Sequence, residues 1–241
     1  MSHHRASSAS RRQLLLTGAA SLTLTLAGVK SRSAHAESST VVMEPGKISA
    51  DEALSRLLAG NTRYVTNTPL PIDSAAARAS VASAQHPIAA IVGCADSRVA
   101  PELIFDQGPG GLFVIRIAGN VASREGIASL EYGVKYLGIP LIMVLGHTNC
   151  GAVAAAVKVA QESTSLPGHL PELIQEIVPA VRTARTRGNA YLVANSIVEN
   201  VRLNTHRLAT SEPVLASEVK ERRVKVVGAI YDLATGKVGL I

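Results

Sequence analysis

Short apolar runs alternate with stretches of helical periodicity through the centre of the chain. The runs are continuous over 88–93, 112–117 and 141–145, as expected of strands that are buried on both faces. Between the second and the third run, residues 123–137 repeat apolar side chains at the three- and four-residue spacing of a helix. Strands that alternate with helices predict an α/β fold with a mostly parallel central β-sheet flanked by helices.

Further elements are predicted on both sides of this central part. Ser49 and Glu52 form a capping box, and a first helix is predicted over about 50–64. Its apolar face has no partner nearby in the sequence, so it packs either on the body of the domain or on a second subunit. The other predicted features are a helix directly after Cys150, a break at 163–168, helices over about 171–186 and 189–210, a strand over 224–231 and a hairpin turn at 234–237.

The first 36 residues differ in composition from the rest of the chain. Residues 1–36 contain five of the 24 Lys and Arg and no Asp or Glu, so the net charge of +6 falls to +1 without them. Arg11 and Arg12 precede an apolar run over 14–29, and a small-x-small cleavage site ends at Ala36. This arrangement resembles a twin-arginine signal peptide and predicts export to the periplasm or the cell exterior. The run is short of the roughly 20 apolar residues of a spanning helix, so no stable membrane anchor is expected after cleavage, with an uncleaved anchor as the alternative.

The rest of the chain is predicted to be a flexible linker over 37–48 and a single domain over 49–241. An apolar content of 47% with 17% charged residues excludes a disordered protein, and two cysteines are too few for a disulfide-stapled scaffold. The near-neutral charge without the leader removes the basic surplus that nucleic-acid binding requires, so no nucleic acid partner is expected.

Three candidate metal ligands follow two of the predicted strands. Cys94 comes directly after the run over 88–93, and His147 follows the run over 141–145, with Cys150 three residues later. Ligands of open parallel sheets bind beyond the carboxyl ends of the strands, where the strand order reverses. If the two strands are neighbours, two thiolates and one imidazole meet there, and this set suits zinc with one tetrahedral position open. Two buried cysteines or one disulfide are the alternatives that the residues alone leave open.

Two charged residues on the Cys94 loop favour a site at this point. Asp96 and Arg98 are two residues apart beside a candidate ligand, although such a pair is also common as a solvated ion pair of a turn. Cys-x-Asp-x-Arg at 94–98, followed by His-x-x-Cys at 147–150, resembles the paired motifs of the β-class carbonic anhydrases. The resemblance covers about 59–155 and includes the segments 60–64, 105–110, 116–120 and 129–132.

The resemblance implies one Zn²⁺ per subunit, bound by Cys94, His147 and Cys150, with water or hydroxide in the fourth position. It also implies two arrangements for Asp96. In a closed form Asp96 coordinates the zinc itself, and in an open form it pairs with Arg98 and accepts a hydrogen bond from the zinc-bound water, so that the two residues act as a catalytic pair.

The resemblance further implies a pocket for carbon dioxide and bicarbonate. Gln85, Phe113 and Tyr132 match substrate-binding positions of the family, as does the backbone N–H of Gly151. The family forms homodimers, often paired again, with the site at the subunit boundary, so a homodimer or a dimer of dimers is expected, with the first helix packing on the partner. The expected reaction is the zinc-dependent, reversible hydration of carbon dioxide to bicarbonate and a proton. Hydrolysis of carbon disulfide or carbonyl sulfide on the same zinc, or a non-catalytic domain with a structural zinc or a disulfide, are the alternatives.

Overall fold

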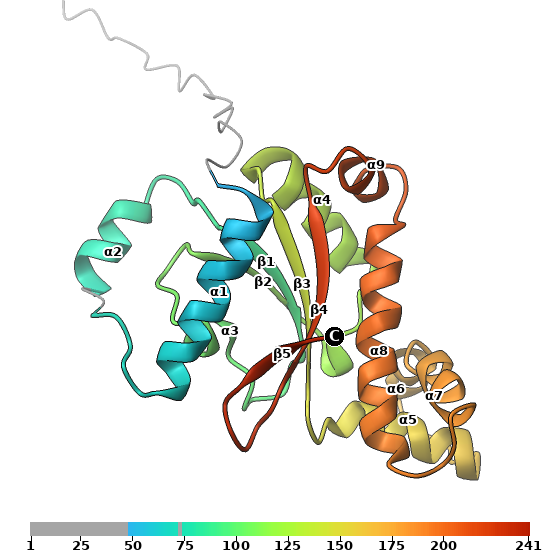
Figure 1. Ribbon diagram of the computed structural model, residues 1–241. Coiled ribbons are helices and arrows are strands. Elements are labelled where there is room, and N and C mark those ends of the chain that lie inside the picture. The colour runs from blue at the N-terminus through green and yellow to red at the C-terminus, as the bar shows by residue number, and fades with distance from the viewer. Residues whose placement is uncertain (1–47, 72–73) are drawn as a thin grey trace, which may run out of the picture. The chain divides into compact units, whose positions relative to one another are not determined.

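The computed structural model describes residues 48–71 and 74–241 (Figure 1). The predicted signal peptide over 1–36 lies outside these residues, as does the predicted linker up to residue 47. Within the described ranges, no helix combines the length and the apolar character that a membrane crossing needs.

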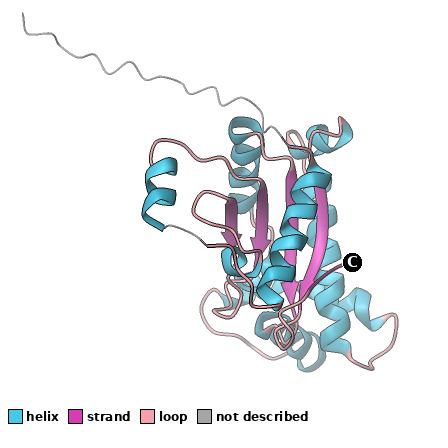
Figure 2. Ribbon diagram, turned by 60° about the vertical axis from the view of Figure 1, so that its left-hand side comes forward, coloured by secondary structure: helices cyan, strands magenta, loops and turns pink. Residues whose placement is uncertain are grey.

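A five-stranded sheet forms the centre of the fold (Figure 2). Its strands are β1 (Ala89–Gly93), β2 (Leu112–Arg116), β3 (Leu141–His147), β4 (Lys225–Tyr231) and β5 (Val238–Leu240). The order is β2-β1-β3-β4-β5, and the first four strands in this order pair in parallel while β5 is antiparallel to β4. The predicted fold class is therefore confirmed. β1 and β3 are neighbours, and the chain order reverses between them because β2 lies on one side of the pair and β4 on the other.

Helices cover both faces of the sheet (Figure 2). They are α1 (Ala50–Val65), α2 (Ser74–Val81), α3 (Pro101–Ile104), a 3₁₀ turn η1 (Ala118–Asn120), α4 (Arg124–Leu137), α5 (Gly151–Glu162), α6 (Leu170–Gln175), α7 (Val178–Arg185), α8 (Leu192–Ala209) and α9 (Leu215–Lys220). The helices predicted over 50–64, over 123–137 and after Cys150 are confirmed. The helix predicted over 171–186 is wrong as one element, because Pro179 in the first turn of α7 cannot donate a backbone hydrogen bond to a continuous helix.

Side chains of the buried strands alternate between two apolar layers. Ala90 and Val92 of β1 belong to the cluster that α4, α8 and α9 cover, whereas Ile91 belongs to the cluster under α1 and α3. This alternation is the two-residue period of a strand, and both layers are apolar because helices lie on both faces.

Helix α1 packs on the sheet of its own chain (Figure 1). Ser49 caps it by accepting a hydrogen bond from the Glu52 amide, and Leu57 is fully buried in the cluster it shares with β1 and β3. Asn61 donates to the Gly236 carbonyl at 2.8 Å and accepts from the Val238 amide at 2.9 Å, which ties α1 to the hairpin between β4 and β5. Of the two expectations for this helix, packing on its own domain is confirmed, and additional packing on a partner subunit stays a prediction.

Candidate metal centre

Two strand ends and one helix start bring three ligand-type side chains together. Cys94 directly follows β1, His147 ends β3, and Cys150 is the N-cap of α5. Their ligand atoms all lie within 4.8 Å of one another, and the three residues are 3%, 0% and 1% exposed. Two sulfurs on one tetrahedral zinc ion lie about 3.8 Å apart, so the cluster has the size of a single-ion site. Both cysteines are free thiols and form no disulfide.

The imidazole of His147 is oriented as a metal ligand. Its Nδ1 lies 2.9 Å from the Thr148 carbonyl oxygen and donates to it, which leaves the lone pair on Nε2. Nε2 is buried and has no hydrogen-bond partner among the described residues. A buried polar atom without a partner costs free energy, and a metal ion would remove this cost because Nε2 would become its ligand. The residues present therefore fit a zinc ion.

The electrostatics of the cluster favour a cation. A hydrogen bond from Cys150 lowers the pKa of Cys94 against the opposing effect of burial, and His147 lowers it further. The same contact raises the pKa of Cys150, as does burial. Burial alone would lower the pKa of His147, but the neighbouring Cys94 thiolate outweighs it and raises the pKa. A divalent ion would allow both sulfurs to be thiolates and the imidazole to be neutral, which is the state in which they bind metal.

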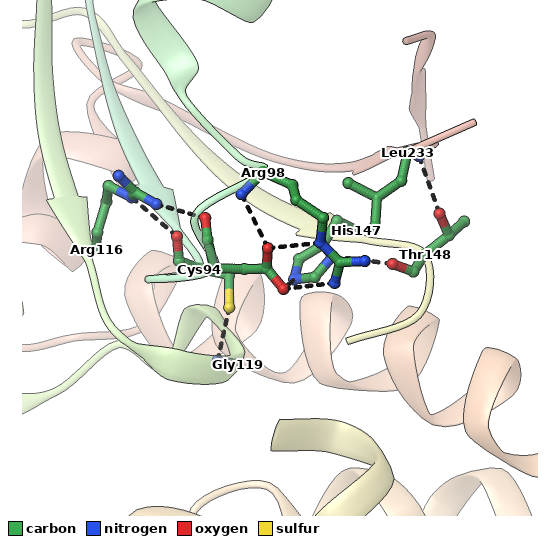
Figure 3. Close-up of polar contacts among 8 residues, drawn as sticks. Cys94, Arg98, Arg116, Gly119, His147, Thr148 and Leu233 are labelled. Carbon is green, nitrogen blue, oxygen red and sulfur yellow. Dashed lines mark hydrogen bonds and ion pairs between the residues drawn. The ribbon is translucent and has the colours of Figure 1, made fainter. Parts of the chain in front are cut away.

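Asp96 and Arg98 form a two-pronged ion pair beside the cluster (Figure 3). Arg98 donates from Nε to Oδ1 at 2.9 Å and from Nη2 to Oδ2 at 2.7 Å, and its backbone amide donates to Oδ1 at 3.0 Å. These bonds hold the pKa of Asp96 well below its usual range. Asp96 Oδ2 lies 3.9 Å from His147 Nε2, so the ionised carboxylate faces the cluster while Arg98 holds it.

The backbone around Cys94 is fixed by residues from the next strand and the turn after it. Arg116, at the end of β2, donates to the Cys94 carbonyl at 3.0 Å and to the Asp96 carbonyl at 2.6 Å. The Gly119 amide donates to the Cys94 sulfur at 3.2 Å (Figure 3). Neither residue is among the site residues predicted from the sequence. The available signal was the position of both at the end of a predicted strand, which is where site residues of parallel sheets gather.

Comparison with known proteins decides the family. Residues 89–238 match the family model described as carbonic anhydrase. The chain belongs to the carbonic anhydrase family. It is 37% identical over 182 residues to the carbonic anhydrase of Mycolicibacterium smegmatis, and the aligned segment covers 75% of this chain and 88% of that protein. It is also 37% identical over 190 residues to carbonic anhydrase 2 of Mycobacterium tuberculosis, with 77% and 89% covered.

Solved structures place this carbonic anhydrase in the β class. The β-carbonic anhydrase of Coccomyxa, in complex with acetazolamide, superimposes with a TM-score of 0.60 at 30% identity and covers 78% of this chain and 86% of that chain. A β-carbonic anhydrase of Aspergillus fumigatus superimposes with a TM-score of 0.61 at 27% identity, with 78% and 90% covered. Each similarity covers more than three quarters of this chain, so fold and family agree.

The predicted substrate residues of this carbonic anhydrase fall into two groups. Gly151 begins α5 next to Cys150 and therefore lies at the metal cluster. Gln85 precedes β1 whereas Cys94 follows it, and Phe113 lies near the start of the edge strand β2, where it pairs with Ala90. Gln85 and Tyr132 line one cavity of about 400 Å³, and no member of the metal cluster lines it. The chain by itself thus brings Gly151 to the cluster and keeps the other three residues apart from it.

Proposed function

We propose that this β-class carbonic anhydrase catalyses the reversible hydration of carbon dioxide to bicarbonate and a proton, with one Zn²⁺ per subunit bound by Cys94, His147 and Cys150. The observation that carries the proposal is the buried pair of thiols beside His147 Nε2, which has no partner in residues 48–71 and 74–241, at the point where β1 and β3 end. When bound, zinc supplies a water of lowered pKa as the nucleophile. Three protein ligands leave one tetrahedral position open, which is typical of catalytic rather than structural zinc.

Asp96 and Arg98 would act as a pair that orients this water. The ionised carboxylate can accept a hydrogen bond but cannot donate one. A water beside Asp96 would therefore donate to the carboxylate and keep a lone pair free for carbon dioxide. Arg98 would keep Asp96 ionised and would keep it from binding the metal, because both carboxylate oxygens already accept from the guanidinium. The closed form, with Asp96 on the metal, would require these bonds to break.

The remaining substrate contacts would come from a second subunit of a homodimer. Gln85, Phe113 and Tyr132 do not meet the cluster within one chain, although the family resemblance assigns all three to the pocket. β2 is an edge strand, and its residues 112–115 are only partly buried. An exposed apolar edge favours pairing with another chain, and a dimer at this edge would bring Phe113 to the subunit boundary. The Gly151 amide, at the exposed start of α5, would bind a bicarbonate oxygen.

Residues 1–36 would direct the enzyme out of the cytoplasm, with 37–48 as a linker and 49–241 as one catalytic domain. The support is the sequence itself, since the adjacent arginines, the apolar run and the cleavage site occur in the order of a twin-arginine signal. Sequencing the N-terminus of the protein recovered from the periplasm would test this. A mature protein that begins at Met1 in the cytoplasm would contradict it.

The reaction is tested by stopped-flow measurement of proton release from carbon dioxide, with zinc content determined on the same samples. Asp96→Asn should retain zinc and lose at least about tenfold in turnover, because the amide can donate to the water and misorient it. Cys94→Ser should lose both zinc and turnover. Glu102→Gln, which removes an exposed carboxylate on α3, is the control and should match the parent.

Two outcomes would count against these assignments. Normal zinc and normal turnover in Asp96→Asn would remove Asp96 from the mechanism. Faster turnover of carbonyl sulfide or carbon disulfide than of carbon dioxide, measured in parallel assays, would replace the proposed substrate while leaving the zinc site in place.

A further inference from the structure

Helix α8 carries a buried polar stripe that contacts the turn η1. Ser196, Asn200 and Asn204 follow one another at the four-residue spacing of a helix face, and all three are 0–1% exposed. Val201, on the same helix, belongs to the apolar core. The stripe is therefore buried beside apolar side chains, where a polar side chain costs free energy unless it has a hydrogen-bond partner.

The two asparagines of this stripe hold the backbone in the middle of the turn η1 and just after it. Asn200 Nδ2 donates to the Gly119 carbonyl at 2.7 Å, and Asn204 Oδ1 accepts from the Ala122 amide at 2.8 Å. Asn204 Nδ2 also donates to the Asn200 carbonyl at 2.9 Å and lies 3.2 Å from Asn200 Oδ1. This last contact fixes the orientation of the Asn200 amide, because with Oδ1 toward Asn204 the Nδ2 group must face Gly119.

Gly119 joins this stripe to the sulfur of Cys94. Its carbonyl accepts from Asn200, and its own amide donates to Cys94 Sγ at 3.2 Å. Gly119 has a φ of 72°, and two soft dihedral angles separate its amide from its carbonyl. A residue without a side chain cannot hold these angles by itself, so the anchored carbonyl sets the direction in which the amide points.

We propose that Asn200 is a positioning residue of the metal centre: it holds the Gly119 carbonyl so that the Gly119 amide donates to the Cys94 sulfur. The inference rests on the proposed zinc site. An N–H···S hydrogen bond withdraws electron density from a thiolate and fixes its direction, so it changes how the sulfur binds the metal. Groups that contact a metal ligand in this way change metal affinity or activity about 10–100-fold when they are removed.

A buried asparagine on the other face of the sheet supplies the matched control. Asn61 of α1 is 6% exposed and donates to the buried Ile104 carbonyl at 3.2 Å and to the half-buried Gly236 carbonyl at 2.8 Å, so its loss also removes the donor of a buried carbonyl. Its hydrogen bonds among the described residues go to Ile104, Gly236 and Val238, none of which belongs to the turn η1. Asn61→Ala and Asn200→Ala should therefore both lower the unfolding midpoint in urea, and only Asn200→Ala should change the metal centre.

The experiment compares the metal-binding properties of the parent protein, Asn200→Ala and Asn61→Ala. The zinc dissociation constant is measured by competition with a chromophoric chelator, and the sulfur-to-metal charge-transfer absorption is recorded after Co²⁺ substitution. Asn200→Ala should weaken zinc binding about 10–100-fold and shift the absorption band, whereas Asn61→Ala should leave both at the parent values. Asn200→Thr keeps a side chain of similar volume and removes the amide donor, because its hydroxyl can bond the carbonyl four residues earlier in its own helix. It gives the same test, without a buried charge, if the alanine variant does not fold.

The outcomes separate this inference from the proposed function. If Asn200→Ala and Asn200→Thr bind zinc within about twofold of the parent and keep its cobalt spectrum, the positioning role is overturned while the zinc site stands. An equal change in Asn61→Ala would also overturn it, because the effect would then follow from stability alone. A parent protein that binds no zinc would overturn the proposed function and this inference together.

Discussion

The backbone carbonyl and the side-chain sulfur of Cys94 both accept hydrogen bonds from groups that lie far from it in the sequence. Its carbonyl accepts from Arg116, and its sulfur accepts from the Gly119 amide. Both partners follow β1 by more than 20 residues, and they reach Cys94 because β2 pairs with β1 and ends at the same edge. The position of the sulfur therefore depends on the turn after β2 as much as on the loop after β1.

Gly119→Ala should damage the fold and the metal centre together. A Cβ at this position would lie 2.6 Å from Ile177 Cδ1, and a φ of 72° is strained for any residue with a side chain. We expect a loss of about 1–3 kcal/mol in the free energy of unfolding, measured by urea denaturation, with weaker zinc binding in the chelator assay. Gly168→Ala is the control, because φ is 57° there and no atom lies within 4 Å of the added Cβ. Equal losses in the two variants would show that the contact with Ile177 has no effect.

At the scale of single residues, the ligands could be predicted and the groups that hold them could not. Cys94 and His147 stand directly at the ends of two apolar runs, so the rule for parallel sheets is enough to expect them side by side. Asn200 contacts Gly119 across 81 residues of sequence, and its position in α8 shows only that it faces the core. No local pattern distinguishes a buried asparagine that binds a particular carbonyl from an exposed one.

Among the elements, α9 is tied to α4 by one buried carboxylate. Glu218 is 6% exposed, accepts from Arg223 Nε at 2.5 Å and accepts from Lys135 Nζ at 3.0 Å. Arg223 lowers the pKa of Glu218 most, and Lys135 lowers it further against the opposing effect of burial. A six-residue helix has few backbone hydrogen bonds of its own, so α9 depends on such tertiary contacts.

Glu218→Gln should destabilise the protein by about 2 kcal/mol at neutral pH, because charge-assisted hydrogen bonds are lost and the half-exposed partners limit the cost. A carboxyl group with a lowered folded pKa stabilises the fold fully above its unfolded pKa of about 4.3. Its contribution is lost as the pH falls through the lower folded value. The difference in melting temperature between parent and variant should thus be constant from about pH 8 to pH 6 and should shrink below about pH 4. Glu162→Gln is the control, because Glu162 forms an exposed pair with Lys158 and its loss should change the melting temperature little. A melting-temperature difference between parent and Glu218→Gln that grows on acidification would contradict the role of Glu218.

Elements were predicted correctly where burial produces a long hydrophobic pattern in the sequence, and they were missed where the element is too short or too uniform in composition to show one. β1 and β3 are covered on both faces, so their sequences are continuous apolar runs that identify them without further information. α3 has four residues and α9 has six, which is too short for helical periodicity to appear. α2, over Ser74–Val81, consists mainly of small residues with little contrast between faces, so nothing in the hydrophobic pattern marked it.

The arrangement of the whole molecule separates the metal cluster from the pocket residues. The cluster lies where the strands end, and Gln85 lies before β1 begins. Gln85 and Tyr132 share a cavity with the exposed Tyr136 on the α4 side of the fold. The family resemblance predicted these residues for the pocket but could not assign them to a subunit, because a sequence is the same in both partners of a homodimer.

In the proposed homodimer, a mixed dimer would decide which subunit supplies Gln85. Cys94→Ser should abolish zinc binding, and Gln85→Ala should keep zinc but lower turnover, so each homodimer should be nearly inactive. In a heterodimer of the two, isolated with a different affinity tag on each chain, the zinc of the Gln85→Ala subunit would face the intact Gln85 of its partner. We expect one working site of two and about half of the parent activity per dimer, with one zinc per dimer by metal analysis. If Gln85 served its own subunit instead, the only zinc would sit beside the alanine, and the heterodimer would be no more active than the Gln85→Ala homodimer.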